Sequence, residues 1–118
     1  MIHKPTGPTL ALYNFLIQKA KAKSISNYTE AGALVGLEAH DPTFWNMLAE
    51  VSEYSHQEYG VLLSVLVVNF KSGFPGGSFF DLANSLKGVK IRDKLRFFCE
   101  EYTRCHKTDW GKDEKNSN

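Results

Sequence analysis

The sequence predicts a small, mostly helical α+β domain of winged-helix-like order with one short β-hairpin. Apolar residues recur at helical spacing in several capped segments, and a run of branched apolar residues at 61–68 leads into a turn rich in glycine and proline. With 118 residues, 42% of them hydrophobic, the chain can bury one ordinary core but not two. We expect one domain over 1–110 and a disordered polar tail over 111–118.

The first expected helix covers about 8–22. Pro8 suits its first turn, and lysines in its last turn suit a helix C-terminus. A second, brief helix is expected to be capped by Thr29 and to stop at Gly36.

The third expected helix covers 42–59. Asp41 is its expected cap, Pro42 occupies its first position, and Gly60 follows its end. This combination of start and stop signals predicts a well-defined helix.

The apolar run 61–68 predicts a strand buried on both faces. Residues 69–77 then form a loop or hairpin, in which 77–80 pairs back as a second strand. In the alternative, Ser78 caps a helix that ends at Gly88.

A last helix is expected at about 91–106. Cys99 and Cys105 lie six residues apart on it, so they point in different directions and are expected to be reduced thiols. The apolar stripe of this helix is Ile91, Leu95, Phe98, Cys99 and Tyr102.

The net charge of +1 gives no simple argument for nucleic-acid binding, but charge is segregated along the chain. Residues 1–23 carry no acid, residues 24–60 carry no Lys or Arg, and residues 87–107 are mainly basic. These faces are either solvated, mutually neutralising surfaces or a basic binding surface. The chain also has no apolar signal core or membrane-length apolar run, so a cytoplasmic protein is expected.

The order of elements is that of a helix-turn-helix followed by a wing. In such a module the helix 42–59 would enter the major groove and present Lys, Arg, Asn or Gln to base edges. It carries Glu50, Glu53 and Glu58 instead. Like charges a few Å apart repel by on the order of 1 kcal/mol per pair even in water, which disfavours major-groove reading by this helix.

A long pattern spans the middle of the chain: HDPTFWNMLAEVSEYSHQEYGVLLSVLVVNFKSGFPGGSFFDLA. With the closing RFFCEEYTRCHKTDW, it resembles a group of uncharacterised small bacterial domains with an F-W helix, an L-G-E-I-S-like turn, an L-S-A-V-V-V-like strand, a G-x-P-G turn and F-F-E-L-A. The likeness covers about two thirds of the chain and departs from the pattern at Ala49 and Asp81. It implies a single bacterial domain and no particular activity.

A more distant resemblance, in the order of elements only, is to the winged-helix DNA-binding half of alkyltransferase-like proteins. Where that family holds a reactive cysteine and histidine, this chain reads Leu62, Leu63, Ser64 and Val65. The resemblance therefore implies no alkyl transfer.

Glu50, Ser64 and His40 support a small hydrolase as a third hypothesis. The chain has no G-x-S-x-G elbow, so we expect Ser64 to be a packed residue whose hydroxyl bonds locally. Glu50, if it points inward, is expected to be a buried carboxylate that accepts hydrogen bonds. The histidines and cysteines show no C-x-x-C or H-E-x-x-H spacing, so no metal or other cofactor is expected.

The main prediction is a non-enzymatic binding module for a protein partner, in a bacterial or phage defence or regulatory setting. Exposed Phe70 and Phe74 would form an apolar patch suited to a protein or to a stacked nucleobase. The residues expected to contact the partner are Glu50, Glu53, Phe70, Lys71, Phe74 and Gly76. The alternative is a winged-helix-like nucleic-acid module that uses Lys71, Lys90, Arg92, Lys94 and Arg96.

Overall fold

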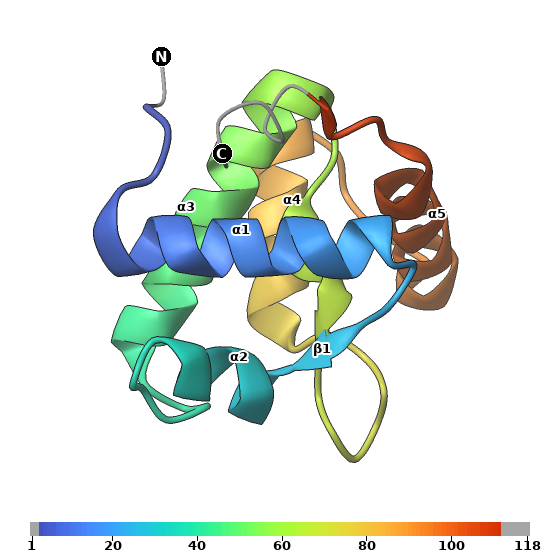
Figure 1. Cartoon of the computed structure of the whole chain (residues 1–118). Coiled ribbons are helices and arrows are strands. Elements are labelled where there is room, and N and C mark those ends of the chain that lie inside the picture. Colours follow the sequence, from blue (N-terminus) through green and yellow to red (C-terminus); the bar gives the residue numbers. More distant parts are fainter. Residues whose placement is uncertain (1–2, 112–118) are drawn as a thin grey trace.

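The computed structural model describes residues 3–111 (Figure 1). Over these residues the predicted class, a mostly helical α+β domain, is confirmed. The elements are α1 (Gly7–Lys21), β1 (Ser26–Asn27), α2 (Tyr28–Leu34), α3 (Pro42–Tyr59), the 3-10 turn η1 (Leu63–Leu66), β2 (Val67–Val68), α4 (Gly77–Lys87) and α5 (Lys94–Lys107). The tail predicted to be disordered lies outside the described residues from residue 112 onward.

The first and third helices match the prediction to within a residue. α3 begins after Asp41, whose Oδ1 accepts a hydrogen bond from the Thr43 N–H at 2.8 Å, and ends at Gly60 in the left-handed conformation with φ of 75°. The second helix has a different cap from the one predicted. Asn27 caps α2 by accepting from the Glu30 N–H at 2.8 Å, which places Thr29 inside the first turn.

Segment 61–68 is buried as predicted, but only its last two residues form a strand. Buried N–H groups need partners, and here helix side chains supply them in place of a neighbouring strand. The N–H groups of Leu62, Leu63 and Ser64 donate to Glu101 Oε2 at 2.6 Å, Ser55 Oγ at 3.0 Å and Ser52 Oγ at 2.9 Å. The long central strand was therefore a wrong prediction.

The predicted hairpin is also wrong. β2 pairs in parallel with β1, so that Ser26 lies opposite Val67 and Asn27 opposite Val68. The chain makes this crossover through α2 and α3, because a parallel pair cannot be closed by a tight turn. Residues 77–80 start α4 rather than a returning strand, so the described residues 3–111 contain no hairpin wing.

The last two helices follow the sequence signals with two shifts. α4 ends at Gly88 as predicted, but its N-cap is Gly76 rather than Ser78. α5 starts at Lys94, three residues later than predicted, because the Asp93 carboxylate caps it by accepting from the Arg96 N–H at 3.0 Å. Its buried positions are Glu101 and Cys105, whereas Leu95 and Cys99 of the predicted stripe are exposed.

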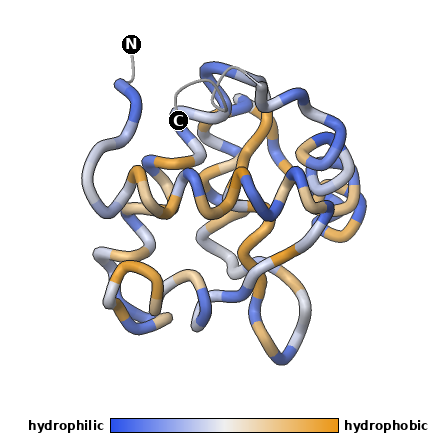
Figure 2. Tube along the Cα trace, in the orientation of Figure 1, coloured by the Kyte–Doolittle hydropathy of each residue, from blue (hydrophilic) through white to orange (hydrophobic). Residues whose placement is uncertain are grey.

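The core lies where α1, α3 and α5 surround segment 61–68. Figure 1 shows α1 crossing in front of α3 and of this segment, and Figure 2 shows the segment as hydrophobic where it passes behind α1. The loop after β2 extends from the body at the end where α2 begins.

Candidate functional site

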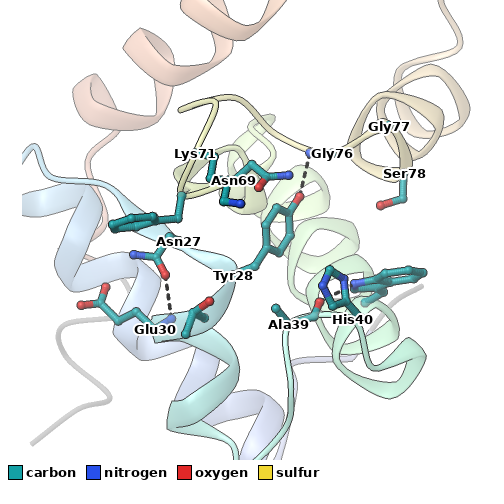
Figure 3. Close-up of a pocket in the computed structure, with 13 residues that line it drawn as sticks. Asn27, Tyr28, Glu30, Ala39, His40, Asn69, Lys71, Gly76, Gly77 and Ser78 are labelled. Atoms are coloured by element: carbon teal, nitrogen blue, oxygen red, sulfur yellow. Dashed lines mark hydrogen bonds between the residues drawn. The ribbon is translucent and has the colours of Figure 1, made fainter.

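An open groove of about 960 Å³ lies between the start of α2, the link from α2 to α3, the loop after β2 and the start of α4 (Figure 3). Ligand sites in proteins commonly have volumes of roughly 300–1,000 Å³, so the groove lies at the upper end of that range. Its lining residues are Asn27, Tyr28, Thr29, Glu30, Ala39, His40, Trp45, Asn69, Phe70, Lys71, Gly76, Gly77 and Ser78.

Tyr28 stands in the middle of the groove and connects its two sides (Figure 3). Its phenol oxygen accepts a hydrogen bond from the Gly76 N–H at 2.9 Å, and its ring meets the Phe44 ring edge-on at 6.4 Å. A Cβ at position 76 would lie 3.3 Å from this oxygen, so glycine permits the close approach. Burial raises the pKa of Tyr28, although the Gly76 hydrogen bond acts in the opposite direction.

Two large aromatic side chains of the groove are open to solvent. Phe70 is 81% exposed and Trp45 is 42% exposed. Trp45 is also held in place, because its Nε1–H donates to the Ala39 carbonyl at 2.9 Å. Exposed aromatic rings beside a concave surface are typical of interaction sites.

The charged residues of the groove differ in whether they are paired. The Glu30 carboxylate accepts from Ser26 Oγ at 2.7 Å and lies 3.5 Å from Lys19 Nζ. The Ser26 hydrogen bond, more than the Lys19 charge, lowers the pKa of Glu30. Lys71 is exposed and makes no hydrogen bond or ion pair with the described part of the chain. The groove therefore carries one unpaired positive charge.

The structure brings three of the six predicted partner-binding residues together. Phe70, Lys71 and Gly76 line the groove. Phe74 does not, because its ring packs inward at 5.4 Å from Phe80 and 5.2 Å from Phe98.

The other two predicted partner-binding residues, Glu50 and Glu53, lie on α3 and do not line the groove. The sequence reasoning missed Tyr28 and Trp45 as groove residues. Sequence spacing could not single out Trp45, because adjacent helix residues lie about 100° apart and can both face the core, as Leu12 and Tyr13 of α1 do.

The hydrolase residues Glu50, Ser64 and His40 do not form one site. Ser64 is buried and lines an adjoining cavity of about 230 Å³, which shares Tyr28, Trp45 and Ser78 with the groove. Its hydroxyl accepts a hydrogen bond from Ser52 Oγ at 2.5 Å. His40 lines the larger groove, and Glu50 is exposed and lines neither cavity. Ser64 is packed as expected, but its hydroxyl bonds to a side chain of α3, twelve residues earlier, rather than locally.

Among residues 3–111 the buried carboxylate is Glu101 rather than Glu50. Besides the Leu62 N–H, its neighbours are Lys87 Nζ at 3.5 Å and Arg104 Nη1 at 3.4 Å. Lys87 and Arg104 each also donate to the Gly60 carbonyl at 3.0 Å. This network joins the end of α3 to α4 and α5 and is structural.

The residues of the nucleic-acid alternative are divided between two places. Lys71 lines the groove, whereas Lys90, Arg92, Lys94 and Arg96 are exposed residues around the start of α5 that do not line it. Two of these four have partners. Lys94 Nζ lies 5.4 Å from the centre of the Phe80 ring, and Arg96 Nε lies 3.7 Å from a Glu100 oxygen.

Within residues 3–111 no three His, Cys, Asp or Glu side chains are grouped as metal ligands would be. No helix in the same range has both the length and the apolar character needed to span a bilayer. Comparison with models of protein families, with curated proteins and with solved structures gave no match. The two resemblances noted from the sequence therefore stay predictions.

Proposed function

We propose that this protein is a non-enzymatic binding module that holds a segment of a partner protein in the groove around Tyr28. The observation that carries the proposal is the pair of exposed aromatic rings, Phe70 and Trp45, on the same open groove. Buried aromatic anchors contribute much of the affinity in protein interfaces, and an exposed ring gains most when a partner covers it.

The polar side chains support binding over catalysis. The Ser64 hydroxyl is bonded to Ser52, and the candidate base His40 lines the other cavity. A serine nucleophile needs a base within hydrogen-bond reach, and this pair lacks that arrangement.

The biological setting of the protein is also part of the proposal, and it is inferred from the sequence. The resemblance to small bacterial domains supports a bacterial protein, and we propose a defence or regulatory role in bacteria or phage. Two free cysteines, of which Cys99 is exposed, are consistent with the cytoplasm, where thiols stay reduced.

A site-specific photo-crosslinker tests the proposal. A benzophenone amino acid would replace Phe70 in the groove or, as a control, Leu95, which is 63% exposed and lies outside the groove. After irradiation in the native host, we expect a protease-sensitive adduct at position 70 and none at position 95. Equal adducts at both positions, or none at position 70, would contradict the proposal.

The second candidate function is nucleic-acid binding. It is favoured by the exposure of Lys90, Arg92, Lys94 and Arg96, with Asp93 as the one acid among residues 90–96. Phosphate contacts of this kind give salt-sensitive affinity. Retention on heparin that is lost at moderate salt, and lost again when all four cations are replaced by glutamine, would support this function over protein binding.

A further inference from the structure

We infer that the segment held in the groove carries an acidic side chain within two residues of a large apolar one. This inference rests on the proposed function and specifies the chemistry of the partner. It follows from the charges and the aromatic rings on the groove lining.

The apolar requirement comes from Phe70 and Trp45. Phe70 is 81% exposed on the loop after β2, and Trp45 is fixed near the start of α3 by its bond to Ala39. An aromatic or branched aliphatic side chain of the partner would cover apolar surface at either ring. A purely polar segment would leave this apolar surface exposed to water.

The acidic requirement comes from Lys71, which follows Phe70 in the sequence and lines the same groove. It is exposed and has no partner among residues 3–111, so an incoming carboxylate need not displace an existing ion pair. The positive end of the dipole of α4, whose cap Gly76 supplies no side chain, adds to the same potential.

The nearby acids do not cancel this charge. Glu30, the one acid on the groove lining, is already bonded to Ser26 and paired with Lys19. Asp41 and Glu38 lie on the link between α2 and α3 but do not line the groove, and the Asp41 carboxylate is used to cap α3. A basic segment would instead meet Lys71 directly. Charge complementarity therefore favours an acidic partner.

A displayed library of random twelve-residue peptides tests the inference, because selection from it does not require the identity of the partner. Selection would be run on the intact wild-type chain, on Lys71→Glu and on Lys90→Glu, which changes another exposed lysine that lies outside the groove. We expect wild type and Lys90→Glu to enrich Asp or Glu beside aromatic or branched residues. Lys71→Glu is expected to enrich Lys or Arg at that place.

Fluorescence anisotropy with one selected peptide provides the quantitative check. Replacing its acidic residue by the neutral amide should weaken binding to wild type roughly fivefold, as expected for one partly exposed ion pair, and should not weaken binding to Lys71→Met. Thermal melts confirm that each variant is folded.

The outcomes separate the two proposals. The inference is overturned if the enriched peptides are apolar without an acidic bias, or if Lys90→Glu has the same effect as Lys71→Glu. Either result is still compatible with the proposed function, in which the groove binds a peptide segment. Selection on Phe70→Ala, run in parallel, gives the background. Absence of any enrichment above this background contradicts the groove as a peptide site and the inference with it.

Discussion

The phenol oxygen of Tyr28 accepts a hydrogen bond from the backbone N–H of Gly76, a residue 48 positions later, at 2.9 Å. This bond fixes the start of α4 and the end of the loop after β2 against the first residue of α2. It therefore holds together two segments that line the groove.

Removing the Tyr28 hydroxyl tests this bond. Tyr28→Phe leaves the half-buried Gly76 N–H without its acceptor, so we expect the free energy of unfolding to fall by about 1 kcal/mol. Urea denaturation measures the change. Tyr102→Phe is the matched control, because the Tyr102 hydroxyl has no hydrogen bond within the described residues and its loss should cost less than about 0.5 kcal/mol. Equal losses in the two variants would argue against the bond.

The two buried serines Ser52 and Ser64 should differ in what they contribute. Ser52 Oγ both donates to Ser64 Oγ and accepts the Ser64 N–H at 2.9 Å. Ser52→Ala leaves that N–H unpaired in the core, at a cost of about 2 kcal/mol, whereas Ser64→Ala removes only an acceptor for a hydroxyl. Chemical denaturation should therefore rank Ser52→Ala as the less stable variant. The reverse order would assign the dominant role to the Ser64 side chain.

Glu101 should be among the most sensitive positions on α5. Glu101→Ala removes the acceptor of the Leu62 N–H and the partner of the nearly buried Lys87, so we expect a loss of about 3 kcal/mol. Glu100→Ala, on the same helix but paired only with exposed Arg96, is the control and should change stability by less than about 0.5 kcal/mol. Calorimetric melts of the two variants compare them directly. Similar melting temperatures would rule out a buried network.

Because of the buried thiol of Cys105, we expect the free energy of unfolding to fall at alkaline pH. Burial, with a smaller contribution from the charge of Glu101, raises the pKa of the Cys105 thiol. The unfolded chain therefore loses this proton first, and stability that is complete below the ordinary thiol pKa falls as the pH rises above it. Between about pH 8 and pH 9.5 we expect a loss of about 1 kcal/mol, measured by urea denaturation at each pH.

The controls for that prediction are the two single cysteine variants. Cys105→Ala should abolish the thiol component of the slope, whatever its effect on stability at neutral pH, whereas exposed Cys99→Ser should leave the slope unchanged. A slope that persists in Cys105→Ala would have to come from another group. In native protein a thiol reagent should label Cys99 and spare Cys105.

The sequence predicted those features that depend on neighbouring residues. Asp41, Pro42 and Gly60 define α3 through local capping chemistry, and Gly88 ends α4 in the same way. The burial of segment 61–68 could also be predicted, because apolar residues are mostly found in the interior of a protein.

Tertiary structure decided the features that depend on distant partners. Segment 61–68 is mostly not a strand because its N–H groups bond to side chains of α3 and α5, and β2 pairs with Ser26–Asn27 far upstream. The same applies to the site. Phe70 and Lys71 could be identified from the sequence as candidate loop residues. Phe74 was also a candidate, but its ring packs inward against Phe80. Tyr28 and Trp45 line the same groove as Phe70 and Lys71 only because of the tertiary fold. Local sequence specifies caps and burial, whereas the hydrogen-bond partners and the lining of a groove depend on which segments the completed core brings together.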